Sequence, residues 1–312
     1  MHETLLIAIG GNALLHPGVR GSVEQETVNA SLTADAVAGI VERGYRVLLT
    51  HGNGPQIGSQ LLRSEMSAAA TYALPLDLCV SMTQGEIGYL LQRSLQTALK
   101  SRGIDPLVVT LITQVLVDPL DCSFRRPSKP IGPVLTREIA ARKNSELGWT
   151  IVEEAPGRFR RSVASPRPLE ILELEVIRRC LHEHLIVIAA GGGGIPVVRD
   201  NGSVKGAEAV VDKDRVSCLL AATLKIGTFV MVTDIDCAYL NFGRLDQQPI
   251  RTLTLETALD YLAAGQFGEG SMKPKIESAV EFIGRGGRET IITDIQHLEA
   301  SLDGRAGTRI MA

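Results

Sequence analysis

The 312-residue sequence lacks the cysteine patterns of a metal or redox protein. It has five cysteines, an odd number, and no two are closer than 19 residues, so there is no C-x-x-C pair. Without paired spacings, neither a zinc site built on cysteines nor a disulfide framework is expected. Most of these cysteines are expected to be small buried apolar residues.

The chain also lacks an excess of either charge and any long apolar segment. With 35 acidic and 32 basic side chains its net charge is −3, which offers no basic surface for nucleic acid or for a membrane. The longest apolar run, residues 185–198, is broken by four glycines and a proline and is too short to span a bilayer. The first residues show no signal-peptide pattern. We therefore expect a soluble cytoplasmic protein.

Two common phosphate-binding loops are absent as well. No Gly-Lys dipeptide occurs, which excludes a G-x-x-x-x-G-K-[ST] loop. The dinucleotide loop G-x-G-x-x-G is also missing, which argues against a dinucleotide-dependent oxidoreductase. Lysine is scarce, with 8 residues against 24 arginines, so a lysine within a Gly/Pro-rich loop is more informative than usual.

What the sequence does contain is an alternation of buried strands and helices. This alternation predicts an α/β protein with a mostly parallel sheet covered on both faces. Gly44, Gly103 and Gly227 stand where helices are expected to end. The predicted strands are 5–9, 45–50, 106–112, 185–190, 228–233 and 290–293, and the predicted helices are 24–43, 78–102, 169–184, 215–224, 255–264 and 274–285.

One stretch, residues 118–167, interrupts this rhythm. It is rich in proline and arginine and holds only short alternating pieces, which indicates a small hairpin subdomain or lid outside the main sheet. A hinge is expected near residues 202–209. The sequence therefore divides into an N-terminal part, 1–209, and a C-terminal part, 210–312.

Three predicted strands end on glycine clusters. Ligands of open α/β sheets bind at the carboxyl ends of the strands, and glycine there lets a ligand approach the backbone amides. An oxyanion or phosphate site is expected, although each cluster alone fits a tight strand-to-helix turn. His51, at the mouth of the second cluster, is expected mainly to pack. The clusters are Gly10-Gly11-Asn12, Gly52-Asn53-Gly54 and residues 191–194.

Three lysines lie in unusual predicted loops: Lys129, between prolines, Lys213, between two aspartates, and Lys275, at the start of a predicted helix. Transfer of a phosphoryl group needs compact positive charge around the migrating group, which lysine supplies. The alternative for each is a solvated surface cation. Asp212 and Asp214, on either side of Lys213, are expected to orient its ammonium group. One of them could instead contact Mg²⁺, and Asp214 could simply cap the next helix.

Longer motifs resemble those of carbamate kinase, a branch of the amino-acid kinase superfamily. The similarity runs in order from about residue 4 to residue 311. The sequence departs from the family pattern at three places. Lys273 stands at a position that is usually apolar, Pro156 and Phe159 alter a run within the subdomain, and the segment before Lys129 has more arginines than usual. The motifs are "AIGGNALL", "THGNGPQIG", "MTQGEIGYLLQ", "LITQVLVD", "PSKPIGPVLT", "GRFRRSVASPRP", "GGGGIPVVRDNG", "GAEAVVDKD" and "GSMKPKIESA".

The resemblance implies an open three-layer α/β/α sandwich with a protruding subdomain at about residues 118–167. Residues 1–209 would bind carbamate or carbamoyl phosphate, and residues 210–312 would bind the nucleotide. A homodimer is also implied. The reaction would be carbamoyl phosphate + ADP ⇌ carbamate + ATP, with Mg²⁺ on the nucleotide. Carbamate carries its own nucleophilic oxygen, so no strong general base is needed.

Site residues follow by motif match. Lys129 would reach the substrate phosphate, Lys213 would bridge the transferring group, and Lys275 would contact the nucleotide phosphates. The first two glycine clusters, Gly10, Gly11 and Asn12 with Gly52, Asn53 and Gly54, would bind the substrate. Residues expected near the nucleotide are Thr233, Asp234, Asp236, Tyr239, Gly270, Ser271 and Met272.

Two other functions remain open at this point. A related kinase of the same fold would phosphorylate acetylglutamate, glutamate or UMP; the long motifs argue against it. A nucleotide-binding sensor without turnover is the second alternative, and the three lysines argue against it.

Overall fold

The chain is built around one large sheet. The computed structural model describes residues 3–11, 22–105, 107–268 and 272–312. In these residues eight strands pair in the order β15-β17-β16-β12-β1-β2-β9-β3, and every neighbouring pair is parallel except β16 with β17. The strands are β1 (Thr4–Ile9), β2 (Arg46–His51), β3 (Val108–Thr110), β9 (Ile186–Ile188), β12 (Thr228–Val232), β15 (Thr252–Thr254), β16 (Glu289–Thr293) and β17 (Thr308–Met311).

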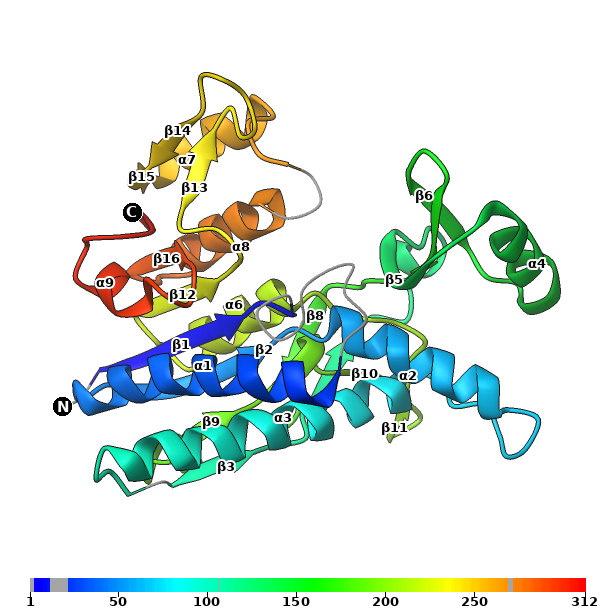
Figure 1. Cartoon of the computed structure of the whole chain (residues 1–312), viewed down its shortest axis with the longest axis horizontal. Coiled ribbons are helices and arrows are strands. Elements are labelled where there is room, and N and C mark those ends of the chain that lie inside the picture. Colours follow the sequence, from blue (N-terminus) through cyan, green and yellow to red (C-terminus); the bar gives the residue numbers. More distant parts are fainter. Residues whose placement is uncertain (1–2, 12–21, 106, 269–271) are drawn as a thin grey trace.

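Helices cover both faces of this sheet because its central strands are apolar on both sides. In β1, Leu6 and Ala8 pack into one core, whereas Leu5, Ile7 and Ile9 pack into the other. Figure 1 shows the layers, which confirm the expected α/β/α sandwich. The second core also contains α1 (Val23–Glu42), α3 (Leu76–Ser101) and α9 (Leu298–Leu302); the first contains α5 (Leu174–His182), α6 (Lys213–Thr223), α7 (Leu255–Ala263) and α8 (Met272–Gly284).

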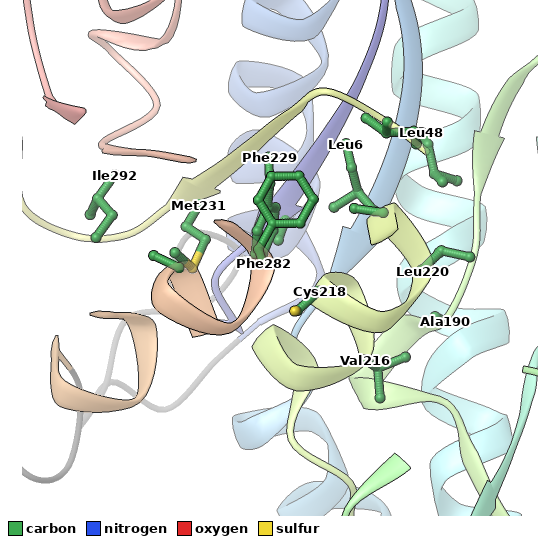
Figure 2. Packing of buried hydrophobic residues seen from close by; sticks show 14 of the residues in the cluster. Leu6, Leu48, Ala190, Val216, Cys218, Leu220, Phe229, Met231, Phe282 and Ile292 are labelled. Carbon is green, nitrogen blue, oxygen red and sulfur yellow. The ribbon is translucent and has the colours of Figure 1, made fainter. Parts of the chain in front are cut away.

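In the first core, α6 and α8 pack against the main sheet. Phe229 of β12 and Phe282 of α8 meet edge to face, with ring centroids 5.6 Å apart (Figure 2). Leu220 of α6 is fully buried in the same cluster. Complete burial of each such side chain is worth roughly 1.5–3 kcal/mol. This packing fixes the position of α6 and α8 on the sheet. Both helices have residues expected to carry function in their first turn.

The predicted subdomain is present within residues 118–167 and projects from the body (Figure 1). Its strands form a separate antiparallel sheet in the order β5-β7-β6, and α4 (Arg137–Leu147) packs beside it. A short helix, η2 (Cys122–Phe124), precedes them. The strands are β5 (Lys129–Leu135), β6 (Ile151–Ala155) and β7 (Arg158–Val163).

Two smaller sheets complete the fold. Near the subdomain, four strands pair in the order β11-β10-β4-β8, and elsewhere β13 pairs with β14. A turn of 3-10 helix, η3 (Gly191–Gly193), follows β9. The strands are β4 (Gln114–Val117), β8 (Pro168–Ile171), β10 (Ile195–Asp200), β11 (Ser203–Gly206), β13 (Ala238–Leu240) and β14 (Gln248–Ile250).

Each half of the chain supplies one contiguous set of strands to the main sheet. Strands β1, β2, β9 and β3 come from residues 1–209, and β12, β16, β17 and β15 come from residues 210–312. The assignment of substrate to one half and nucleotide to the other stays a prediction. Among the described helices, none has both the length and the apolar content needed to cross a membrane.

Several predicted boundaries differ from the structure by two or more residues, among them the starts of α3 and α8 and both ends of β3. The helix predicted over 169–184 begins only at Leu174, because residues 168–171 form β8 and pair with β4. Helix α6 begins at Lys213 rather than at residue 215. Helix α6 ends at Thr223 with Leu224 as its C-cap, and the left-handed residue that follows is Lys225, with a φ of 57°, rather than Gly227.

Helix α2 (Gly54–Ser67), like α4 and α9, was not predicted. The Gly-Pro pair at its start reads as a turn in the sequence. Proline is nevertheless favoured in the first turn of a helix, where its missing N–H costs nothing, and Pro55 occupies such a position. The second glycine cluster therefore leads directly into a helix N-terminus, which suits an anion.

Candidate active site

The three predicted lysines converge on the N-terminal end of α6. Lys213 is the first residue of that helix, Lys129 begins β5 in the subdomain, and Lys275 lies in the first turn of α8. Their ammonium groups do not extend freely into solvent. Each contacts one of the two aspartates, Asp212 and Asp214, that flank Lys213 in the sequence.

Asp212 has two tasks. Its Oδ1 accepts hydrogen bonds from the backbone amides of Asp214, at 2.9 Å, and of Arg215, at 3.3 Å, so Asp212 is the N-cap of α6. Its Oδ2 lies 3.1 Å from Lys129 Nζ. The alternative that Asp214 caps the helix is therefore wrong, and Asp212 contacts Lys129 instead of orienting Lys213.

Asp214 joins the other two lysines. Its Oδ1 lies 2.8 Å from Lys213 Nζ, and its Oδ2 lies 2.8 Å from Lys275 Nζ. All three side chains are close to nine-tenths buried, with exposed fractions of 11% for Lys213, 12% for Lys275 and 7% for Asp214. Lys213 Nζ is also 3.4 Å from the carbonyl oxygen of Ala8 in β1. The ammonium of Lys213 therefore faces the end of the strand that carries the first glycine cluster.

Burial and charge oppose each other in this cluster. Burial lowers the pKa of Lys213 and outweighs the attraction of Asp214. Burial acts on Lys275 in the same direction, but Asp214 and the charges of Asp212 and Asp234 raise its pKa overall. Burial would raise the pKa of Asp214, yet the two lysines hold it well below its usual range. Two cations thus share one carboxylate, which leaves positive charge available for a bound anion.

The first two glycine clusters lie backbone against backbone. The amide of Gly52 donates to the carbonyl oxygen of Ile9 at 2.9 Å. A methyl group added to Gly52 would lie 2.6 Å from the nitrogen of Gly11, and one added to Gly11 would lie 3.3 Å from the nitrogen of Gly54. Gly10 donates to Val232 of β12 at 3.0 Å. Glycine is needed at Gly52 because of this close approach. Asn12 lies outside the described residues.

The third cluster closes against the other two. Added methyl groups would lie 2.2 Å from the side chain of Asn53 at Gly192 and 2.2 Å from the carbonyl oxygen of Val211 at Gly193. Both glycines have positive φ, of 65° and 86°. The loop thus contacts the second glycine cluster on one side and the residue before the N-cap of α6 on the other.

Two supporting residues were not predicted, Gln84 and Thr113. The side-chain amide of Gln84 donates to the carbonyl oxygen of Gly191 at 2.9 Å and accepts from the amide of Thr113 at 2.9 Å. The hydroxyl of Thr113 accepts from the amide of Ala190 at 2.9 Å. Gln84 lies in the quoted stretch "MTQGEIGYLLQ", and the signal that could have identified it is a glutamine within an otherwise buried helix face.

His51 is fully buried beside the same loop. Its Nδ1 lies 3.1 Å from the carbonyl oxygen of Gly52, and a methyl group on Gly191 would lie 2.3 Å from its Nε2. Burial lowers the pKa of His51 to about 4. A neutral ring held between two glycine loops fits the packing role predicted for it.

The residues predicted to contact the nucleotide follow β12 and begin α8. Thr233 donates its amide to Thr293 at 2.8 Å. The hydroxyl of Tyr239 donates to Asp236 at 2.7 Å, which raises the pKa of Tyr239 and lowers that of Asp236. Met272, the first residue of α8, is buried. The charge of Asp234 acts on Lys275. Gly270 and Ser271 lie outside the described residues.

The carboxylates of this site are poorly placed to cage a metal ion. Across the described part of the chain, no group of three or more His, Cys, Asp and Glu side chains is arranged to hold one. Both oxygens of Asp214 face lysines, and those of Asp212 face Lys129 and the helix amides. A divalent cation here would take its ligands largely from phosphates and water, as Mg²⁺ commonly does.

Comparisons with known proteins agree with this geometry. Residues 3–294 match the amino acid kinase family. The chain is 41% identical to the carbamate kinase of Pyrococcus furiosus over the full length of both, and 43% identical to that of Staphylococcus epidermidis over 98% of each. It superposes on the solved structure of the Giardia lamblia carbamate kinase bound to AMP-PNP with a TM-score of 0.92, 36% identity and coverage of 99% and 98%.

Proposed function

This chain belongs to the amino acid kinase family, among the carbamate kinases, and we propose that its lysine-aspartate cluster transfers a phosphoryl group between carbamoyl phosphate and ADP. The activity class, a phosphotransferase, rests on relatives that cover the whole chain. The roles of individual residues are our inference from the geometry.

The convergence of three lysines carries this proposal. Lys129, Lys213 and Lys275 come from the subdomain, the start of α6 and the start of α8, yet all three meet Asp212 or Asp214. Lysines with purely solvated roles would not be buried against shared carboxylates. Compact cations near backbone amides at strand ends are what a migrating phosphoryl group requires.

In the proposed reaction, a β-phosphate oxygen of ADP attacks the phosphorus of carbamoyl phosphate. The bond from phosphorus to the carbamate oxygen breaks, and carbamate leaves as an anion. Charge gathers on the oxygens of the migrating group, and Lys213 neutralises it while Asp214 keeps the ammonium in place. Neither direction needs removal of a proton from the nucleophile. A site whose carboxylates, Asp212 and Asp214, are held in ion pairs with lysines is consistent with this chemistry.

The remaining lysines hold the two ends of the reacting pair. Lys129 binds the phosphate of carbamoyl phosphate from the subdomain side. The amides of Gly11 and Gly54, with Asn12 and Asn53, bind the rest of that substrate, and Gly10 and Gly52 leave it room to approach while their own amides hold the strand ends together. Lys275 binds the nucleotide phosphates.

The nucleoside is placed farther along the C-terminal part of the chain. Thr233, Asp234, Asp236 and Tyr239 line the adenosine, as do residues 270–272 at the start of α8. The neighbourhood of Asp234 and Lys275 supports this placement.

The nucleotide is proposed to enter with Mg²⁺. The site suits a cation that is bound mainly by the nucleotide phosphates, because Asp212 and Asp214 already contact lysines and backbone amides. When bound, Mg²⁺ supplies charge neutralisation on the nucleotide phosphates. The chain's own contribution is to orient the phosphates through Lys213 and Lys275.

We also propose a homodimer located in the cytoplasm. Apolar side chains are exposed on the adjacent helices α1 and α3, among them Val28 and Leu32 on α1 and Met82 and Tyr89 on α3. Such a surface supports association. Light scattering coupled to size exclusion would give twice the mass of 33.5 kDa, and a Leu32→Asp variant should give the monomer mass.

A coupled assay of ATP formation tests the function. Purified protein with carbamoyl phosphate, ADP and Mg²⁺ should form ATP, whereas acetylglutamate, glutamate and UMP should not be phosphorylated by ATP. Phosphorylation of one of those acceptors without use of carbamoyl phosphate would identify a related kinase of the same fold. Nucleotide binding with no turnover on any of them would identify a sensor.

A further inference from the structure

A cavity lies at the end of the main sheet opposite to the proposed active site, where β1 and β2 begin and α5 and α6 end. Its volume is about 340 Å³. Five basic or imidazole side chains border it, together with one carboxylate. They are Arg46, Arg178, His182, Lys225 and Arg288, with Glu3 as the acid. No part of the proposed reaction uses this cavity.

Two of these cations differ from the others in their ion pairing. Arg288 is engaged by Glu3 and Glu289, and Arg178 lies 3.4 Å from Glu175. Arg46 and Lys225, by contrast, make no ion pair with any residue that the structure describes. The Nε of Arg46 is buried and has no hydrogen-bond acceptor within residues 3–11, 22–105, 107–268 and 272–312. Leaving a buried charged donor unsatisfied is costly, which points to an acceptor supplied by a ligand.

Capping of the helices does not account for these cations. At the end of α6 the amide of Ile226 donates to Ala221 at 2.9 Å, and at the end of α5 the amide of Leu185 donates to Cys180 at 3.0 Å. Backbone amides therefore satisfy helix carbonyls that basic side chains might otherwise bind.

The backbone of Lys225 is a separate observation. Its φ of 57° lies in the left-handed region, where glycine or asparagine is the usual residue after a helix. Lys225 therefore has a backbone conformation that is unfavourable for lysine, and it borders the cavity. A residue held in a strained conformation is a reason to look for a function there.

From these observations we propose that the cavity binds a small phosphate compound with at least two negative charges. Arg46 would supply a guanidinium fork that matches phosphate oxygens, and Lys225 would supply a point charge beside it. The volume exceeds that of a single phosphate ion. Inorganic pyrophosphate and a phosphorylated small metabolite share this chemistry.

The test should measure ligand binding at the cavity itself, because phosphate compounds also bind at the proposed active site. Lys225 is exposed enough to react with a neutral amine-acylating reagent, and its labelling rate can be followed by peptide mass spectrometry in ADP-saturated protein. Pyrophosphate should slow labelling of Lys225 by about fivefold or more. Lys100, exposed at the end of α3 and outside the cavity, is the internal reference and should label at an unchanged rate.

An Arg46→Gln variant makes the test specific. Loss of one charged donor should raise the pyrophosphate concentration needed for protection by roughly tenfold. If this variant has a lowered Tm, Arg178→Gln replaces it, since Arg178 is exposed on α5 and borders the same cavity. A third variant, Lys225→Asn, suits the left-handed backbone and should weaken pyrophosphate binding measured by calorimetry on the ADP complex.

The two sources of the ligand are separated by a parallel titration with ribose 5-phosphate. Protection by pyrophosphate alone would assign an inorganic ligand, and protection by the sugar phosphate as well would assign a phosphorylated metabolite. Equal labelling of Lys225 with and without both compounds at millimolar concentration would overturn the proposal, whatever the outcome of the kinase assay.

Discussion

Asp214 and Lys275 meet at 2.8 Å although 61 residues separate them in the chain. The same carboxylate holds Lys213 at 2.8 Å through its other oxygen. This bridge ties the start of α6 to the start of α8, the two helices that the aromatic contact of Phe229 and Phe282 anchors in the core. It also places two ammonium groups side by side, which repel each other unless an anion lies between them.

We predict that Asp214→Asn destabilises the fold and abolishes turnover. Removing one member of a buried ion pair leaves charge uncompensated and typically costs about 3–5 kcal/mol. Here two lysines would be left facing each other. Urea unfolding and the coupled ATP assay measure both effects. Asp303→Asn, which weakens surface pairs with Arg43 and Arg305, is the control and should change stability much less. Unchanged unfolding of Asp214→Asn would contradict the bridge.

We predict that Lys213→Ala lowers kcat by about 10² or more, the usual scale for loss of one donor to a developing charge. Lys100→Ala, on an exposed part of α3, should leave kcat unchanged. Both variants are measured in the ATP-forming direction at saturating substrates. Retained turnover without Lys213 would move the bridging role to another residue.

The two tasks of Asp212 can be separated by substitution. Asparagine is as good an N-cap as aspartate, so Asp212→Asn should keep α6 intact while losing the ion pair with Lys129. We expect near-normal unfolding but weaker use of carbamoyl phosphate, seen as a raised KM. Asp212→Ala should lose both the N-cap and the ion pair with Lys129, which lowers the unfolding free energy by about 1 kcal/mol more than Asp212→Asn does. Identical unfolding curves for the two variants would contradict the capping role.

The glycine loops offer a matched pair of substitutions. In Gly52→Ala the new methyl group would lie 2.6 Å from the Gly11 nitrogen, whereas a methyl group at Gly54 would have no atom of the described residues within 4 Å. We expect Gly52→Ala to lose about 1–3 kcal/mol of stability as the loops separate. Gly54→Ala should fold normally and lose affinity for carbamoyl phosphate only. Thermal unfolding and KM measurements distinguish them, and a stable, fully active Gly52→Ala would refute the close packing.

Stability should fall in mild acid because His51 stays neutral in the fold. Its pKa is lowered from 6.5 to about 4 by burial. The unfolded chain therefore binds a proton below pH 6.5 that the folded chain does not, and stability is lost as the pH drops toward 4. The contribution reaches about 3 kcal/mol at the acid end of this window.

A His51→Gln variant tests this pH dependence. It should show a shallower fall in unfolding free energy between pH 6.5 and 4, even if it is less stable at neutral pH. Equal slopes for wild type and variant, measured by urea unfolding at several pH values, would contradict a neutral buried ring.

Several features followed from the sequence because they depend on local chemistry. Apolar runs such as 5–9 and 228–233 predict strands buried on both faces, and those strands lie side by side in the sheet. Glycines at the strand ends predict close backbone approach, which Gly52 and Gly193 show. The scarcity of lysine singled out Lys129, Lys213 and Lys275. Each inference uses residues within a few positions of one another.

The tertiary structure alone decided which charges meet. Asp212 contacts Lys129 across 83 residues, and Asp214 bridges two lysines instead of capping its helix. The pattern over 168–171 suits a helix, but pairing with β4 makes it a strand. Gln84 supports a glycine loop from another element. Periodicity and capping are set by neighbours in the chain, whereas ion pairs and close loop contacts depend on how distant elements pack, which no local pattern encodes.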